Sequence, residues 1–208
     1  MLNQSFLDFI DKISHRLTQP LPGAAAHEKL LSSNYKQRVL PNDSTRQGAI
    51  LILFFPYREE VYCPMIVRSK YEGVHSGQIA FPGGRYENFD ESLIRTALRE
   101  AQEEIGIYAR DVKVLGTLSE IYIQASNIRV LPVIGTIPYR PAYYPDEREV
   151  EEVFEMSISE LKKRSHIQHT EVQVGSKLVQ APYFGIEGKV VWGATAMMLS
   201  ELLEIIEL

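Results

Sequence analysis

The order of apolar and polar residues predicts helices and strands in alternation. Apolar residues recur at helical spacing over residues 6–17, which indicates a short amphipathic helix. Prolines and a glycine in 20–23 end it, and the stretch from there to Asp43 is predicted to be irregular. It could be a lid, an interface arm or a segment packed on the core. The apolar run 49–55 has the length of a buried strand, and 61–67 is predicted to return beside it.

The rest of the chain adds strands and two further helices around one strongly periodic helix. Ser157 and Glu160 match a capping box, which predicts a helix that runs to about Lys163. The other predicted elements are strands at 112–118 and 128–137, a hairpin of 171–174 and 177–183 around Gly175-Ser176, a short strand at 190–192 and a closing helix at 194–208. Because strands outnumber helices and several are joined by hairpins, we expect an α+β layered domain with a mixed sheet.

The most periodic helix spans about residues 90–105. Its apolar positions are Ile94, Ala97, Leu98, Ala101 and Ile105. Asp90 or Ser92 is expected to cap its start, and Gly106 to end it.

Acidic residues lie along the margin of this helix's apolar face. At about 100° per residue, Glu100 and Glu104 are only about 40° apart, and Glu103 lies one step further round. Like charges at this spacing repel, and close carboxylates raise one another's pKa. A divalent cation relieves both effects. Carboxylate oxygens favour Mg²⁺ or Mn²⁺ over Zn²⁺, and the sequence has no Cys/His cluster for zinc.

A solvated acidic face is the alternative, with Arg99 paired to Glu103 and Arg95 paired to Glu91. The glycine-rich stretch 73–84 directly before the helix favours the metal site, because glycines let the backbone approach a phosphate closely. Metal on the carboxylates would then neutralise phosphate oxygens and activate a water. Together these parts indicate metal-assisted hydrolysis of a phosphoanhydride.

Composition narrows the function classes. The chain has 208 residues and a net charge of −5, so a general nucleic-acid binder is not favoured. A single cysteine, Cys63, cannot form an internal disulfide, which is compatible with a reducing cytoplasm. No apolar run reaches the ~18 residues that a membrane span needs, and the N-terminus does not resemble a signal peptide. We therefore expect a cytoplasmic protein with no membrane partner.

The segment from Arg99 to Ile107 resembles the second half of a Nudix box, Arg-Glu-apolar-x-Glu-Glu-x-Gly-apolar. The first half departs from that pattern, because fourteen residues rather than thirteen separate Gly84 from Arg99. The early acidic residue of the box is therefore either Asp90, counted from Gly84, or Glu91, counted back from Arg99. The coenzyme A pyrophosphatase branch of the Nudix superfamily has the same longer spacing.

Three further segments resemble that branch, and the similarity covers about residues 48–203. They are Arg68-Ser69 with His75 and Gly77 to Gly84, Tyr122-Ile123 with Ser126-Asn127, and Trp192 to Ala196. Glu72 and Gly73 depart from the branch, which usually has Leu and Arg at these two positions. Tyr122 is expected to pack within a strand and Trp192 within the core.

The resemblance implies a Nudix-type α/β/α sandwich over residues 46–208, with residues 1–45 as an N-terminal helix and irregular extension. It implies Mg²⁺ or Mn²⁺ on Glu100, Glu103 and Glu104, with the same glutamates and Arg99 as the catalytic set. The implied substrate-binding residues are Arg68, His75, Gly83, Gly84, Ser126 and Asn127.

The implied reaction is cleavage of the pyrophosphate of coenzyme A or a derivative, to adenosine 3′,5′-bisphosphate and a 4′-phosphopantetheine product. Cleavage of another nucleoside diphosphate conjugate, such as ADP-ribose or NADH, is the alternative, and Gly73 keeps it open. A binding or regulatory module that has lost turnover is a third reading, and the intact glutamates argue against it. Nudix relatives often dimerise, so the resemblance allows a homodimer.

Overall fold

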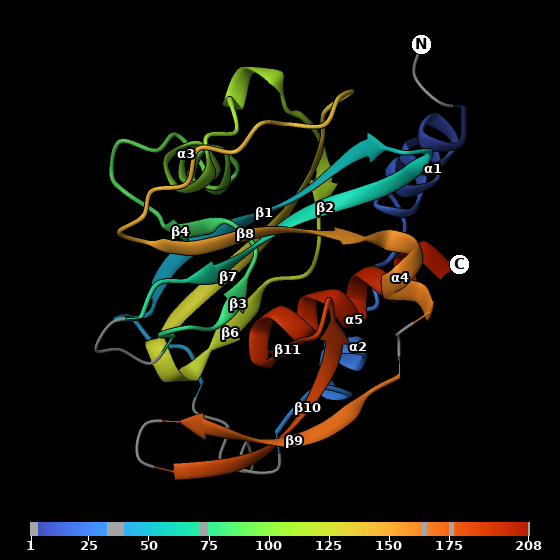
Figure 1. Cartoon of the computed structure of the whole chain (residues 1–208). Coiled ribbons are helices and arrows are strands. Elements are labelled where there is room, and N and C mark those ends of the chain that lie inside the picture. The colour runs from blue at the N-terminus through green and yellow to red at the C-terminus, as the bar shows by residue number, and fades with distance from the viewer. Residues whose placement is uncertain (1–3, 33–39, 71–74, 164–165, 175–176, 208) are drawn as a thin grey trace.

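The computed structural model of the chain describes residues 4–32, 40–70, 75–163, 166–174 and 177–207. A mixed sheet lies at the centre, with α3 on one face and α1 and α5 on the other, and a smaller sheet lies beside α5 (Figure 1). The predicted α+β fold with a mixed sheet is confirmed. The helices are α1 (Gln4–Arg16), α2 (Ala24–Glu28), α3 (Leu93–Ile105), α4 (Ile158–Lys163) and α5 (Gly193–Glu207), with 3₁₀ turns η1 (Ala109–Asp111) and η2 (Gln124–Ser126).

The larger sheet is built on one long strand that pairs on both edges. The path of this sheet runs β3-β2-β1-β7-β5, with β4 also on β1, β6 also on β7 and β8 also on β2. Only β1 and β7 run parallel; the other pairs are antiparallel. The strands are β1 (Arg46–Tyr57), β2 (Glu60–Arg68), β3 (Ile79–Ala80), β4 (Gly83–Arg85), β5 (Lys113–Thr117), β6 (Ile121–Ile123), β7 (Ile128–Thr136) and β8 (Val150–Ser157).

The alternation of side chains along β1 divides the core in two. Ile52 and Phe54 belong to the apolar cluster shared with α1 and α5. Leu51, Leu53 and Phe55 point to the opposite face and pack in the cluster shared with α3. The apolar run that predicted a buried strand is therefore buried on both faces, as expected for a strand with a parallel partner.

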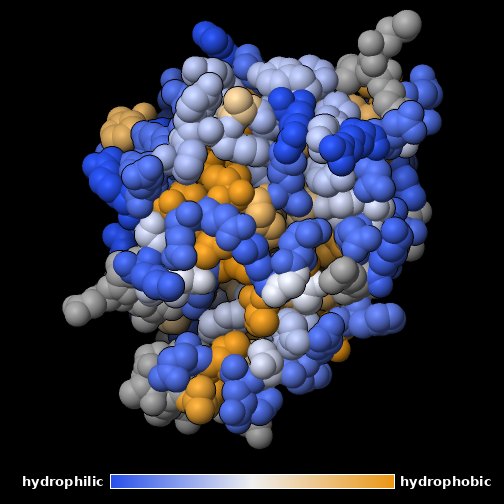
Figure 2. All heavy atoms as spheres, in the orientation of Figure 1, coloured by the Kyte–Doolittle hydropathy of each residue, from blue (hydrophilic) through white to orange (hydrophobic). Residues whose placement is uncertain are grey.

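The second sheet consists of β9 (Gln168–Val174), β10 (Lys177–Ile186) and β11 (Lys189–Trp192), all antiparallel. The predicted hairpin and the short strand after it are confirmed, although Gly175-Ser176 lies outside the described residues. Hydrophobic residues are visible through the middle of the face shown in Figure 2, with hydrophilic residues around them.

The N-terminal segment packs against the core, and the expectation of a wholly irregular stretch up to Asp43 is wrong. Residues Ala24–Glu28 form α2, whose Ala26 is fully buried. The physical reason lies on α5: Glu201 is fully buried there and accepts a hydrogen bond from the Gly23 N–H at 3.1 Å. His27 Nε2 lies 2.8 Å from the same carboxylate. A helix of five residues is too short to show a periodic pattern in the sequence. Its stability depends instead on contacts with Glu201, which is far away in the chain.

Ser119 completes the contacts of this carboxylate, with its Oγ donating to Glu201 Oε1 at 2.7 Å. Burial raises the pKa of Glu201, but hydrogen bonds from His27 and Ser119 outweigh that effect and leave the pKa lowered. Glu201 therefore acts as a buried anion that ties α2, α5 and the chain after β5 together.

No helix in the described part of the chain is long and apolar enough to cross a membrane.

Replacing Glu201 with Ala is expected to lower the free energy of unfolding by about 3 kcal/mol, because it leaves several buried donors without an acceptor. The measurement is urea denaturation at pH 7. Glu204→Ala is the matched control, since Glu204 lies one turn further along α5 in an exposed pair with Lys29. It should cost no more than about 0.5 kcal/mol. Equal losses in the two variants would contradict the role of the buried carboxylate.

Candidate active site

Helix α3 positions the acidic residues through defined ends and one apolar face. The Ser92 side chain accepts a hydrogen bond from the Arg95 N–H, and Gly106 ends the helix in the left-handed conformation. Both predicted caps are thus confirmed, with Ser92 as the start. The Glu104 side chain is only 2% exposed and Glu100 is 15% exposed, whereas Glu103 is 60% exposed. The two glutamates at the margin of the apolar face are therefore drawn into the protein.

Gly83 and Gly84 of β4 meet these two carboxylates directly. The Gly83 N–H donates to Glu104 Oε2 at 2.8 Å. A side chain at Gly84 would place its Cβ 2.5 Å from the Glu100 carboxyl carbon, and one at Gly83 would lie 2.4 Å from the Ala49 carbonyl oxygen. Strand β4 can therefore lie between β1 and the acidic helix only because both of these positions are glycine.

Both buried carboxylates bind protons more readily than an exposed glutamate does. Burial raises the pKa of Glu104 to about 7, against the opposing effects of Arg68 and the Gly83 N–H. Burial also raises the pKa of Glu100, and the charge of Arg99 opposes this effect. The charge of Glu149 raises the pKa of both, so this residue before β8 adds to the negative potential. No motif in the sequence indicated Glu149.

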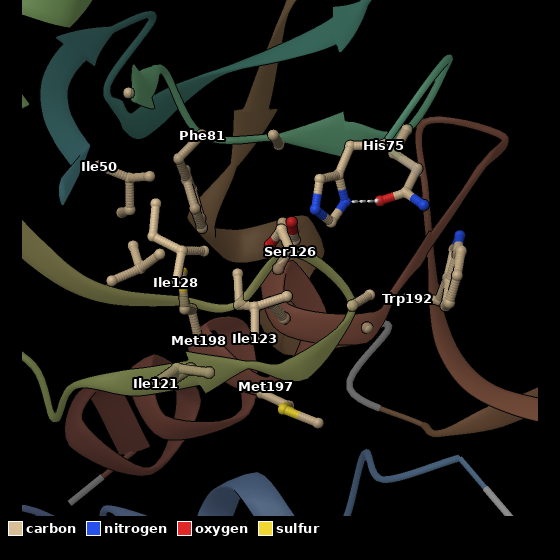
Figure 3. A pocket seen from close by; sticks show the side chains of 18 of the residues that line it. Ile50, His75, Phe81, Ile121, Ile123, Ser126, Ile128, Trp192, Met197 and Met198 are labelled. Carbon is tan, nitrogen blue, oxygen red and sulfur yellow. Dashed lines mark hydrogen bonds between the residues drawn. The ribbon is translucent and has the colours of Figure 1, made fainter. Parts of the chain in front are cut away.

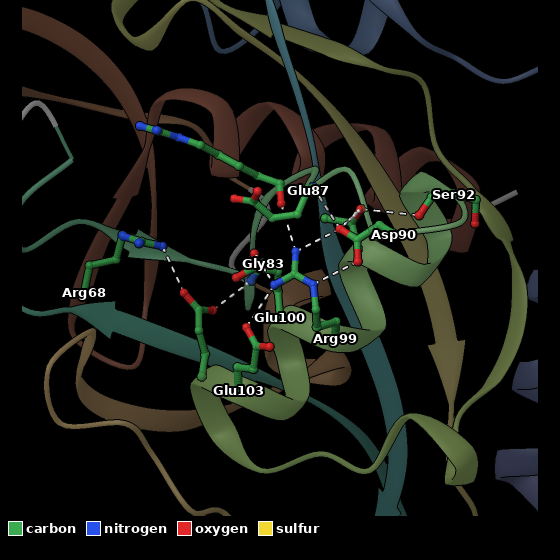
Figure 4. Close-up of polar contacts among 11 residues, drawn as sticks. Arg68, Gly83, Glu87, Asp90, Ser92, Arg99, Glu100 and Glu103 are labelled. Carbon is green, nitrogen blue, oxygen red and sulfur yellow. Dashed lines mark hydrogen bonds and ion pairs between the residues drawn. The ribbon is translucent and has the colours of Figure 1, made fainter.

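Arg99 lies at the centre of the polar contacts shown in Figure 4. Its Nε and Nη2 donate to the two carboxylate oxygens of Asp90, each at 2.9 Å. Its Nη1 lies 2.9 Å from both Glu100 and Glu103. The hydrogen bonds from Arg99 hold the pKa of Asp90 far below its usual range. Arg99 therefore orients carboxylates through a bidentate contact, as a guanidinium does well.

The position of the early acidic residue, open from the spacing, follows from these contacts. The Asp90 side chain is 3% exposed and also accepts a hydrogen bond from Thr96 Oγ1 at 2.9 Å. Glu91 is 80% exposed and pairs with Arg95 at 3.5 Å. Asp90 rather than Glu91 therefore contacts Arg99, and with Asp90 as the early acid the extra residue lies between Asp90 and Arg99.

The donor set has the chemistry of a divalent cation site. In the residues that the structure describes, no three Asp, Glu, His or Cys side chains already form a metal-binding cluster, since Glu100 and Glu103 contact Arg99. Glu104 contacts Arg68 at 3.3 Å and the Gly83 N–H. The carboxylates are hard oxygen donors on neighbouring turns of one helix, and two of them are desolvated with raised pKa values. A hard cation such as Mg²⁺ or Mn²⁺ fits such donors.

A pocket of about 580 Å³ opens beside the glycine pair. Its interior is mainly aliphatic, and Figure 3 shows these side chains pointing toward a common space with His75 and Trp192 at one side. The apolar lining residues include Leu30, Ile50, Phe81, Ile121, Ile123, Ile128, Val130, Val179, Met197 and Met198. The volume is in the usual range for sites that bind small molecules.

The pocket gathers five of the six predicted substrate-binding residues: Arg68, His75, Gly83, Gly84 and Ser126. His75 also supports its own loop, with Nδ1 3.1 Å from Gln78 Oε1. The departures at Glu72 and Gly73 lie outside the described residues.

Asn127, the sixth predicted substrate-binding residue, is not among the residues that line the pocket. It adopts a positive φ of 45° at the end of η2, and its Oδ1 accepts hydrogen bonds from Thr45 and Tyr122, each at 2.9 Å. Asparagine tolerates this left-handed backbone conformation, and its side chain joins the turn to Thr45 before β1 and to Tyr122 of β6. The expected core position of Trp192 is wrong, since Trp192 lines the pocket. Arg46 and Arg85 line it too, although neither lies in a motif singled out from the sequence.

A family model described as the NUDIX domain matches residues 45–174 of the chain. The chain belongs to the Nudix family. A relative from Pectobacterium atrosepticum, the uncharacterised Nudix hydrolase NudL, is 37% identical over 128 residues, which cover 62% of this chain and 66% of the relative. The NudL protein of Yersinia pestis (strain Pestoides F) is 30% identical over 202 residues, 96% of this chain and 94% of the relative.

Solved structures confirm the Nudix fold. The Nudix hydrolase RenU from M. smegmatis matches with a TM-score of 0.56 at 18% identity, over 86% of this chain and 93% of that one. A MutT/nudix family protein from Enterococcus faecalis matches with a TM-score of 0.51 at 14% identity, over 83% of this chain and 66% of that one. The family model ends at residue 174, so Trp192, Met197 and Met198 line the pocket from outside the matched region.

Asp90→Asn is expected to lower both stability and turnover, because it removes the charged acceptor that orients Arg99. At pH 7 the loss of unfolding free energy should be about 2 kcal/mol. The pKa of Asp90 is lowered by folding, so its contribution is present above the unfolded value of about 3.9 and is lost as the pH falls below it. The difference between Asp90→Asn and the unsubstituted protein in urea denaturation should therefore shrink between about pH 5 and pH 3.

Glu91→Gln is the control for this prediction, since Glu91 is exposed and one residue away. It should leave stability and turnover nearly unchanged. A larger effect from Glu91→Gln than from Asp90→Asn would assign the early acid to Glu91 instead.

Proposed function

We propose that the protein hydrolyses the pyrophosphate bond of coenzyme A or a derivative in a reaction that depends on Mg²⁺ or Mn²⁺. The products are adenosine 3′,5′-bisphosphate and a 4′-phosphopantetheine product. One observation carries the proposal: the backbone of Gly83 and Gly84 borders both the buried carboxylates of α3 and the apolar pocket. The carboxylates proposed for hydrolysis and a pocket that can hold a long organic group therefore lie next to each other along β4.

Different residues of the site would have different roles in such a reaction. Glu100, Glu103 and Glu104 would hold the metal ion, which when bound lowers the pKa of the attacking water and polarises the phosphorus centre. Arg99, fixed by Asp90, orients Glu100 and Glu103 through the contacts described above.

Two donors fix the Glu104 carboxylate: the Gly83 N–H bonds to one oxygen, and Arg68 bonds to the other. Arg68 also lines the pocket, which supports a role for its guanidinium in binding a substrate phosphate beside the metal-holding carboxylates.

The character of the pocket favours coenzyme A over the alternative conjugates. ADP-ribose and NADH carry a second sugar with several hydroxyl groups, and an interior that is mainly aliphatic offers these hydroxyl groups few hydrogen-bond partners. The pantetheine arm is long and flexible and has apolar stretches that Ile, Val and Met side chains can cover. Cleavage of ADP-ribose or NADH is the second candidate, because Gly73 stands where the branch usually has Arg.

The test is product analysis by chromatography and mass spectrometry after incubation of the purified protein with coenzyme A, ADP-ribose and NADH in parallel. We expect release of adenosine 3′,5′-bisphosphate from coenzyme A, with a requirement for Mg²⁺ or Mn²⁺ that survives a zinc-selective chelator. Preference for ADP-ribose or NADH would reject coenzyme A as substrate and retain the hydrolytic site. No metal-dependent cleavage of any of the three would reject the proposed function.

Glu104→Gln is expected to reduce kcat at least a hundredfold, because it removes a charged metal ligand. The fold should be kept, since an amide oxygen can still accept the Gly83 N–H. Steady-state kinetics with coenzyme A and far-ultraviolet circular dichroism are the measurements, with Glu91→Gln as the control. A turnover near that of the unsubstituted protein would remove Glu104 from the metal site.

A further inference from the structure

Two arginines are placed side by side by the pairing of β1 with β4. Gly48 is directly opposite Arg85, so both point to the same face of the sheet. Arg46 lies two residues before Gly48 and therefore points to that face as well. Arg46 and Arg85 are thus diagonal neighbours across two strands, at a separation that two long side chains span easily, and both line the pocket.

Neither guanidinium has an anionic partner within the described residues. The ion pairs among the described residues involve other arginines and lysines, and none of the carboxylates that the structure describes lies within ion-pair distance of Arg46 or Arg85. Two like charges held together without a counter-ion repel one another, and an anion between them removes that repulsion. Guanidinium groups match the geometry of phosphate oxygens through paired N–H donors.

A neighbouring hydroxyl adds an independent observation. The Oγ of Ser126 is buried, lines the same pocket and has no hydrogen-bond partner among the described residues. The Arg46 guanidinium donates a hydrogen bond to the backbone carbonyl oxygen of Ser126. A buried hydroxyl without a partner is unfavourable by about 1–3 kcal/mol, and an oxygen-rich ligand would supply the missing acceptor.

Both arginines also have fixed positions relative to the metal site. The Arg85 carbonyl oxygen accepts a hydrogen bond from Arg99 Nη2 at 3.0 Å, which ties its backbone to the acidic helix. Arg46 lies four residues along β1 from Ile50, the residue opposite Gly83, which corresponds to about 13 Å. A pyrophosphate bound beside the glycine pair would therefore leave Arg46 within reach of a group one nucleoside away from it.

We propose that Arg46, Arg85 and the Ser126 hydroxyl form a binding subsite for a phosphomonoester on the nucleotide half of the substrate, separate from the pyrophosphate. The assignment of that group as the 3′-phosphate of coenzyme A rests on the proposed function. The subsite selects for a third phosphate, so it separates coenzyme A from nucleotide conjugates that carry only two.

The test is calorimetric binding of adenosine 3′,5′-bisphosphate and of adenosine 5′-monophosphate, which needs no catalysis. The unsubstituted protein should bind the bisphosphate at least tenfold more tightly. Arg46→Gln and Arg85→Gln should each weaken binding of the bisphosphate severalfold while leaving the monophosphate nearly unchanged, and the double variant should bind both alike. Arg95→Gln, which removes an exposed arginine of α3 outside the pocket, is the control and should keep the full preference.

Equal affinity for the two nucleotides, or no binding of either, would overturn the subsite. So would an equal loss for both nucleotides in the Gln variants, because it would show general attraction rather than recognition of one group. Arg46→Lys and Arg85→Lys retain the charge and should restore part of the preference, and urea denaturation confirms that each variant folds. A preference for the bisphosphate without cleavage of coenzyme A would support the subsite and reject the proposed function.

Discussion

The close approach of β4 to helix α3 is the constraint on which the rest of the site depends. It requires two positions without side chains: Gly83 lies against the backbone of Ala49 and Ile50, and Gly84 lies against the Glu100 carboxyl group. Because β4 can fit there, its N–H holds Glu104 in a buried position at which the carboxyl group has a pKa of about 7. The desolvation that makes these carboxylates favourable ligands for a cation thus follows from two missing Cβ atoms.

The two faces of β1 connect the acidic helix with the pocket. Strand β1 sends one set of side chains into the α3 core, and its other face carries Arg46 and Ile50 into the pocket. The buried anion Glu201 fixes α2 against α5, and both regions bring pocket residues, Leu30 before β1 and Met197 on α5. The central sheet and α3 therefore hold the acidic residues and the glycine pair, and the flanking segments close the pocket beside them.

The sequence predicted those elements that depend on the spacing of residues within one short segment. The periodicity and caps of α3, the hairpin of β9 and β10, and the position of Glu100 and Glu104 at the margin of the apolar face follow from spacing alone. Strand β8 was missed because its alternation is interrupted by acidic residues, and β4 is too short to show a period. Arg46 and Arg85 could not be paired from sequence, since their proximity depends on the register between two strands. Asn127 matched a motif, but its side chain is engaged by Thr45 and Tyr122 rather than by the pocket.

The most direct test of this account is a titration of Mn²⁺ into the unsubstituted protein and Gly84→Ala, followed by electron paramagnetic resonance. The added Cβ would meet the flexible end of Glu100 rather than backbone, so the fold should survive while the carboxylate is displaced. We expect Gly84→Ala to bind Mn²⁺ at least tenfold more weakly than the unsubstituted protein, with an unchanged urea midpoint. Equal Mn²⁺ affinity in the two proteins would contradict the claim that the glycine pair assembles the metal site.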